Sequence, residues 1–141
     1  MRKLLPANAV LVGQSLQSDI DWLGLQEGVD FARSVDLSEQ FKCYNPRFGN
    51  TSFFSLQHEA AVLLGAKPSA GAHDPAQDAQ WSVQLYNKFV APANSATLLK
   101  DARQKLLRIR PQPSVAKLLN YQHEGVCMAK FFKEKCICKQ P

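Results

Sequence analysis

The segment Ala9-Val10-Leu11-Val12-Gly13 is a short apolar run that ends at a glycine. Because polar residues do not alternate with apolar ones in this run, it predicts a buried strand of the kind found in parallel sheets. Residues 15–25 place apolar side chains at helical spacing, and Ser34-Val35-Asp36-Leu37 predicts a second strand. A strand, a helix and a strand in this order form a crossover unit, so we expect an α/β fold with a short parallel two-strand sheet.

Local signals continue this pattern further along the chain. The stretch from Asn45 to Asn50 contains a proline, a glycine and two asparagines, which favours a turn. Ser55 stands before an apolar helical stripe and predicts a helix cap. Asp74, Pro75 and Gln77 occupy the cap, the first position and the third position of a further helix. We therefore expect helices to flank the small sheet.

Charge divides the chain into two parts. Residues 1–90 contain seven lysines and arginines and nine acidic residues, whereas residues 91–141 contain ten basic and three acidic residues. Residues 98–110 predict a basic amphipathic helix that ends at Pro111, and no period is evident after it. We therefore expect a domain over residues 1–90 and a helical or irregular basic extension over 91–141. The basic balance favours a polyanionic partner, and the alternative is a solvated helix face followed by a charged tail.

Composition limits the class of protein. The chain has 141 residues, of which 45% are hydrophobic and 21% are charged, which is typical of one globular domain. No apolar run is long enough to span a bilayer, and no apolar signal core follows the basic residues at the start. We therefore expect an intracellular protein, in the nucleus or the cytoplasm, without a membrane partner.

The four cysteines offer a second kind of chemistry. In an intracellular chain, reduced thiols or a metal site are favoured over disulfides. His123, Cys127, Cys136 and Cys138 follow the pattern H-x3-C-x8-C-x-C, and four ligands of this type can bind zinc. The spacing matches no common zinc motif, so plain reduced cysteines are the alternative to a zinc site.

Two carboxylates and a histidine suggest a catalytic site. Phosphodiester hydrolysis by two metal ions needs converging carboxylates and a base that accepts the proton of the attacking water. Asp19 lies one turn into the helix after the first strand, and Asp78 lies one turn into the helix that begins at Pro75. His73 precedes that helix on its entering loop. We expect all three side chains to face one crevice at the carboxyl ends of the strands.

The order of these segments resembles a known family. The stretch from Val12 to Leu23 resembles the second acidic motif of the DEDDh-type 3′–5′ exonucleases, such as ribonuclease T and the proofreading subunit of DNA polymerase III. The stretch from His73 to Asp78 is similar to their third motif, His-x4-Asp. Residues 34–37 and 55–60 are similar to the connecting strand and helix, so the resemblance runs from about Leu5 to Val90.

The resemblance implies a function as well as a fold. It implies that His73 is the general base, Asp78 a direct metal ligand and Asp19 a supporting ligand for Mg²⁺ or Mn²⁺. The substrate would be a single-stranded 3′ end of RNA or DNA, with RNA favoured over DNA. The first motif, Asp-x-Glu, has no counterpart in this chain, which implies a partial ribonuclease H-like fold with impaired activity. We expect a partner chain or a missing N-terminal segment to complete the sheet.

Alternatives remain for the whole chain and for single residues. The alternative function is a non-catalytic nucleic-acid-binding or regulatory fragment of such a nuclease. Asp19 has the alternative role of a surface helix residue, Asp78 that of a partner of the helix dipole, and His73 that of a loop residue at the cap.

Several other residues are expected to be structural. These include the acidic residues Asp21, Asp36 and Glu59. Phe48, Phe53 and Phe54 are expected to anchor their loop to the core, and the alternative is that they stack on bases. Trp22 and Trp81 are expected to pack their helices.

Overall fold

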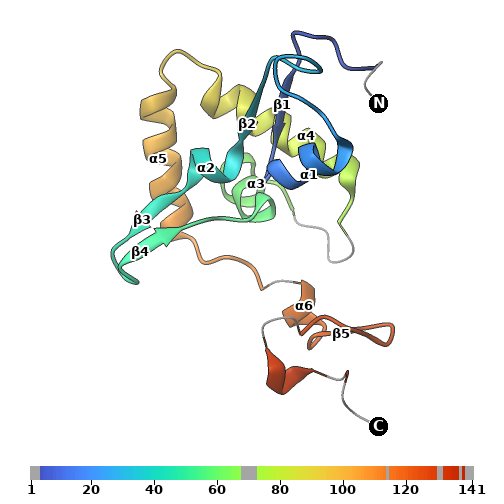
Figure 1. The fold of residues 1–141 in the computed structure, drawn as a ribbon. Helices are drawn as coiled ribbons and strands as arrows, with labels where there is room; N and C mark the ends of the chain where they lie inside the picture. The colour runs from blue at the N-terminus through green and yellow to red at the C-terminus, as the bar shows by residue number, and fades with distance from the viewer. Residues whose placement is uncertain (1–3, 68–72, 114, 130–131, 137, 139–141) are drawn as a thin grey trace. The chain divides into compact units, whose positions relative to one another are not determined.

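The computed structural model describes residues 4–67, 73–113, 115–129, 132–136 and 138 (Figure 1). The chain forms two compact units. The first unit comprises Met1–Pro68 and His73–Arg110, and the second comprises Ser69–Ala72 and Pro111–Pro141.

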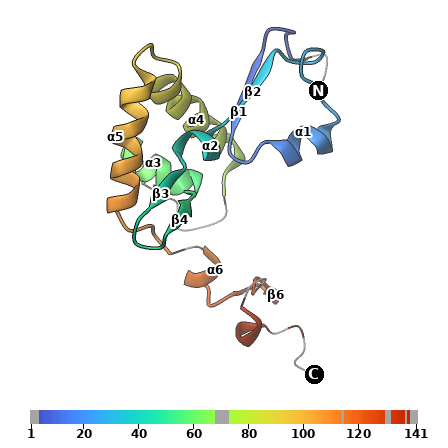
Figure 2. The same cartoon turned by 60° about the vertical axis from the view of Figure 1, so that its left-hand side comes forward.

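A parallel two-strand sheet lies in the first unit, as the sequence predicted. Strand β1 (Val10–Gly13) pairs with β2 (Arg33–Asp36), and Val12 lies opposite Val35 in this register. Helix α1 (Gln17–Leu23) connects the two strands, as Figures 1 and 2 show. The first unit therefore has a mixed α/β fold, with the carboxyl ends of both strands at the same edge of the sheet.

Asp36, the last residue of β2, fixes the turn between β1 and α1. Its carboxylate accepts hydrogen bonds from the backbone N–H groups of Ser15 at 3.0 Å and Leu16 at 3.2 Å. Ser15 has a φ of 54°, a left-handed conformation that non-glycine residues rarely adopt. Because the two bonds come from adjacent amides, a single side chain holds the turn at the point where α1 begins.

A short helix and a hairpin follow the sheet. Helix α2 (Leu37–Phe41) leads into β3 (Cys43–Asn45), which pairs antiparallel with β4 (Asn50–Ser52). The expected turn over residues 45–50 is confirmed, and Gly49 supplies its left-handed residue with a φ of 63°.

Two predicted helix caps are confirmed. Helix α3 (Leu56–Leu64) begins after Ser55, whose hydroxyl accepts a hydrogen bond from the N–H of His58 at 3.2 Å. Helix α4 (Pro75–Leu85) begins after Asp74, whose carboxylate accepts from the N–H of Ala76 at 3.0 Å. The helix continues into one π-helical turn, η2 (Tyr86–Val90).

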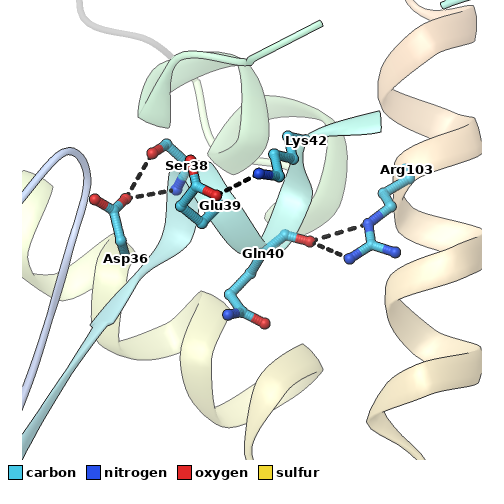
Figure 3. A network of polar contacts seen from close by, with 6 residues as sticks. All are labelled: Asp36, Ser38, Glu39, Gln40, Lys42 and Arg103. Carbon is cyan, nitrogen blue, oxygen red and sulfur yellow. Dashed lines mark hydrogen bonds and ion pairs between the residues drawn. The ribbon is translucent and has the colours of Figure 1, made fainter. Parts of the chain in front are cut away.

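Helix α5 (Ser95–Arg108) belongs to the first unit rather than to a separate extension. Its apolar face is buried at Leu99, Ala102 and Leu106, which join the main core. The guanidinium of Arg103 donates two hydrogen bonds to the carbonyl of Gln40 on α2, at 2.6 and 3.0 Å (Figure 3). The compact unit therefore extends past residue 90 because the basic helix buries its apolar side.

The first unit has two clusters of buried apolar residues. The smaller cluster joins α1 to the loop before β2 and contains Ile20, Leu25 and Phe31. The larger cluster lies among α2, α3, α4, η2 and α5, and its residues are Leu37, Phe41, Leu63, Leu85, Phe89, Leu99, Ala102 and Leu106. The sheet thus carries a small core, and the helices after it carry the main one.

The second unit contains short elements only. These are α6 (Val115–Leu118), β5 (Gln122–His123), β6 (Val126–Cys127) and the 3-10 turn η3 (Lys133–Lys135). In the part of the chain that the structure describes, none of the helices is both long enough and apolar enough to cross a membrane.

Candidate functional site

A polar pocket lies where the parallel strands end. It has a volume of about 570 Å³. Its walls come from the β1–α1 turn and the start of α1, from α2, and from the segment between β4 and α3. The lining residues are Gln14, Ser15, Gln17, Ser18, Asp36, Ser38, Glu39, Phe53, Phe54 and Ser55. Serines and glutamines make up most of this list, and Phe53 and Phe54 add an apolar part to the wall.

Asp36 is the anionic centre of this pocket. Besides its bonds to the β1–α1 turn, it accepts from the N–H of Ser38 at 3.0 Å and from the Ser38 hydroxyl at 2.6 Å (Figure 3). Burial alone would raise the pKa of Asp36. The hydrogen bonds from Ser38, Ser15 and Leu16 outweigh burial and lower this pKa below its ordinary value. These donors keep Asp36 ionised. Through the same hydrogen bonds Asp36 holds the β1–α1 turn and caps α2, in keeping with its expected structural role.

Behind the pocket, Glu59 of α3 is completely buried. The side-chain amide of Gln14 donates to its Oε1 at 3.2 Å and to the carbonyl of Phe54 at 2.6 Å. Burial raises the pKa of Glu59 to about 8, and the charge of Asp36 adds to the rise, although the bond from Gln14 opposes it. Glu59 is therefore neutral at pH 7.

Two buried oxygens beside this contact have no hydrogen-bonding partner, namely Gln14 Oε1 and Glu59 Oε2. A carboxylate offers no donor, but a protonated carboxyl group offers one on its hydroxyl oxygen. The two oxygens belong to side chains that already touch. The orphaned oxygens and the raised pKa of Glu59 thus agree that this carboxyl group is protonated.

His73 and Asp78 lie together at the beginning of α4. Nδ1 of His73 is 3.6 Å from Oδ2 of Asp78, and their side chains are 60% and 30% exposed. The same Nδ1 lies 3.1 Å from the amide nitrogen of Gln57 on α3. The cap at Asp74 and the proline after it fix where α4 starts, and this start places the histidine beside the carboxylate one turn later.

Asp19 is exposed in the first turn of α1. It does not form a set with His73 and Asp78 in which all ligand atoms lie within 4.8 Å, because among the described residues only cysteines form such a set of three. None of the three predicted site residues lines the polar pocket, whose acidic residues are Asp36 and Glu39. The structure therefore brings His73 and Asp78 together and leaves Asp19 outside that pair.

The aromatic residues of the hairpin region differ from what we expected. Phe54 packs partly against the main core, but Phe48 and Phe53 are 66% and 57% exposed. The prediction that they anchor the loop is therefore wrong for these two. Each instead lies near a cation: Arg47 is 5.5 Å from the ring centre of Phe48, and Lys42 is 5.9 Å from that of Phe53. Phe53 also forms part of the pocket wall.

The two tryptophans also differ from each other. Trp81 is buried in α4 as expected, whereas Trp22 of α1 is 85% exposed, so the packing prediction is wrong for Trp22. The carboxylate of Asp21 accepts a hydrogen bond from the amide of Gln17 at 2.8 Å within α1, in keeping with a structural role.

Three of the four predicted soft ligands meet in the second unit. The sulfur atoms of Cys127, Cys136 and Cys138 all lie within 4.8 Å of one another. Hydrogen bonds to Cys127 and Cys136 raise the pKa of the Cys138 thiol to about 11. The side chain of His123 lies outside the described residues, although the backbone of His123 forms part of β5. Three cysteines could thus hold a metal ion.

Comparison with known proteins finds no matching family model, no matching curated sequence and no matching solved structure. Sequence reasoning missed the serine-rich pocket and the burial of Glu59. A signal for the pocket was present, because Gln14 and Ser15 directly follow a strand and Asp36 ends the next one, at the edge where parallel strands bind ligands.

Proposed function

We propose that this chain supplies part of a metal-dependent 3′–5′ exonuclease site acting on single-stranded RNA or DNA. The observation that carries the proposal is the contact between His73 and Asp78, at 3.6 Å, with both side chains accessible to solvent. A histidine beside a carboxylate can accept the proton of an attacking water, and the carboxylate can bind a divalent ion. The family resemblance would add Asp19 as a supporting ligand, although Asp19 forms no set of three close ligand atoms with His73 and Asp78 in the described residues.

The described residues do not fit a complete two-metal centre. Magnesium binds oxygen ligands, and a pair of ions about 4 Å apart needs several converging carboxylates. No set of three ligands that includes a carboxylate lies within 4.8 Å in the described part of the chain. Asp19 is also the first acidic residue of the sequence, so no Asp-x-Glu motif precedes it. The proposed site is therefore incomplete in this chain, and we assign no catalytic step to a metal ion here.

The proposal predicts that the purified chain trims a 5′-labelled single strand no faster than buffer does in Mg²⁺ or Mn²⁺. A protein that also carries an Asp-x-Glu strand, encoded upstream of Met1 in the transcript or added as a partner polypeptide, should shorten the same strand stepwise from its 3′ end. Asp78→Asn and His73→Ala should each slow that trimming by at least about 100-fold. Asp74→Asn, which preserves a capping side chain, is the matched control.

Two results would count against the exonuclease proposal. One is rapid trimming by the chain alone, which would mean that the missing motif is not needed. The other is trimming by the completed protein that Asp78→Asn leaves unchanged. In either case His73 and Asp78 would not have the roles assigned to them.

A second candidate function, binding of single-stranded nucleic acid without cleavage, is favoured by the hairpin. Phe48 and Phe53 are exposed aromatic rings with a cation beside each, and bases stack on such rings in single-strand-binding proteins. Helix α5 adds exposed basic residues, including Lys100, Lys105 and Arg108. The sequence from Ala91 onwards also carries most of the positive charge.

Binding of a fluorescent single strand by the chain tests this candidate. Stacking contributes about 1–3 kcal/mol per base, so the double variant Phe48→Ala, Phe53→Ala should bind at least about 10-fold more weakly. Trp22→Ala removes a still more exposed ring from α1 and is the matched control. Deleting residues 91–141 should remove most of the affinity and flatten its salt dependence, although it also removes α5 from the core. Unchanged binding by the double variant would contradict the stacking role.

A further inference from the structure

The described residues of the second unit form little apolar core. The unit consists of segments of 4 and 31 residues, and domains below about 40 residues usually need a disulfide, a metal ion or a partner to fold. Among its described residues, Ala129 is the only buried hydrophobic one. Four large apolar side chains of the described part are exposed to between 40% and 64%, namely Leu118, Leu119, Val126 and Phe132. A bound metal ion would add stability to a unit of this kind.

We propose that Cys127, Cys136 and Cys138 bind a structural zinc ion that stabilises the second unit. The three sulfur atoms lie within 4.8 Å of one another, and those of Cys127 and Cys136 are 3.8 Å apart. Zinc–thiolate bonds are about 2.3 Å long, so a tetrahedral site has sulfur–sulfur edges of about 3.8 Å. A disulfide would instead need about 2.05 Å between the sulfurs. The observed separation matches the edge of a zinc site.

The backbone brings the thiols together without help from the sulfur atoms. Cys127 ends a tight hairpin, where β6 pairs with β5 and the turn residues Glu124 and Gly125 have φ values of 49° and 80°. The rings of Tyr121 and Phe132 lie 4.9 Å apart and join this hairpin to the segment that carries Cys136. These backbone and ring contacts hold Cys127 close to the segment of Cys136 and do not involve the sulfur atoms.

The turn η3 directly precedes Cys136, the second cysteine of the cluster. Its end is fixed by a hydrogen bond from the N–H of Cys136 to the carbonyl of Lys133, at 3.2 Å. Lys133 and Lys135 lie just before Cys136, and their charges oppose the net negative charge of three thiolates around one Zn²⁺. Structural zinc sites usually have a fourth protein ligand. His123 belongs to the same hairpin, although its side chain lies outside the described residues.

The test uses the full chain, purified with a phosphine reductant and stripped of metal. We expect it to bind one Zn²⁺ with a dissociation constant below about 100 nM. With Co²⁺ as an optical probe, a sulfur-to-cobalt charge-transfer band should appear, and each cysteine variant should lose about one third of its intensity per bound ion. Cys127→Ser, Cys136→Ser and Cys138→Ser should each weaken zinc binding at least about 100-fold. Cys43→Ser, in β3 of the first unit, is the matched control and should bind zinc as the wild type does.

Hydrogen exchange gives a readout that does not depend on affinity. Zinc should slow exchange of the amides of β5, β6 and η3, while those of α3 and α5 in the first unit should stay unchanged. Cys138 is exposed, so Cys138→Ser tests ligation with little loss of packing even if Cys127→Ser fails to fold. A dissociation constant above about 100 nM, equal weakening by Cys43→Ser, or zinc binding that the three cysteine variants leave unchanged would overturn the proposal.

Discussion

Replacing Glu59 by glutamine tests whether a buried neutral carboxyl group supports the pocket. The pKa of Glu59 is about 8 in the folded protein and about 4.5 in an unfolded chain. The folded state therefore keeps a proton that the unfolded state releases between these values. The stability linked to this proton is fully present below pH 4.5 and is lost as the pH rises to about 8. At 1.36 kcal/mol per pH unit, the loss between pH 5 and pH 8 is on the order of 3–4 kcal/mol.

Glutamine preserves the shape of Glu59 and accepts the same bond from Gln14, but it cannot ionise. It also carries an N–H donor where Gln14 Oε1 has no partner. We therefore expect Glu59→Gln to unfold at higher urea concentration than the wild type at pH 8, with the two proteins converging towards pH 5. Urea unfolding at each half pH unit measures the difference, and the exposed Glu39→Gln is the control. Parallel curves for wild type and Glu59→Gln across this range would refute a raised pKa at this site.

Two further substitutions test contacts that position the pocket. Asp36→Ala removes four hydrogen bonds and the cap of α2, so it should lower the free energy of unfolding by about 2–4 kcal/mol. A decrease of less than about 1 kcal/mol, measured by urea unfolding, would contradict this. His58→Phe should lower the free energy of unfolding by about 1–3 kcal/mol. The buried ring of His58 lies 3.0 Å from the carbonyl of Leu106, which is near the end of α5 and has no helical partner. An unchanged melting temperature would show that water satisfies that carbonyl.

The parts of the fold that the sequence predicted depend on neighbours close in the chain. The cap at Asp74 and the proline after it determine the start of α4, and Ser55 determines that of α3, because a capping side chain bonds to amides two or three residues away. The apolar run at residues 10–13 likewise formed a parallel strand, although the predicted burial is only partial, because Val10 is exposed and Leu11 and Val12 are half-buried. In each case, the information lies within one turn or one strand.

The parts that could not be predicted depend on residues distant in the sequence. Glu59 lies on the helix that begins after Ser55, but its burial results from packing against Gln14, 45 positions earlier. The charge of residues 91–141 suggested a separate extension, yet α5 packs into the core because its apolar face meets α3. Phe48 and Phe53 remained exposed although we expected them to anchor the loop, since Phe48 lies in the hairpin turn, Phe53 follows β4, and neither joins a buried cluster.

The edge of the sheet and the cysteine cluster offer ligand atoms of different chemistry, namely carboxyl oxygens and thiol sulfurs. At the edge of the sheet, donors from the β1–α1 turn keep Asp36 ionised, while burial keeps Glu59 neutral behind it. Two carboxyl groups near one pocket therefore differ in charge at pH 7 because only one of them receives several donors. A cation entering the pocket would meet Asp36 first, but the oxygens of Asp36 already accept from Ser15, Leu16 and Ser38. In the proposals above, a hard metal ion would therefore bind Asp78 beside His73 rather than Asp36, whereas the thiols of the second unit suit a soft metal ion.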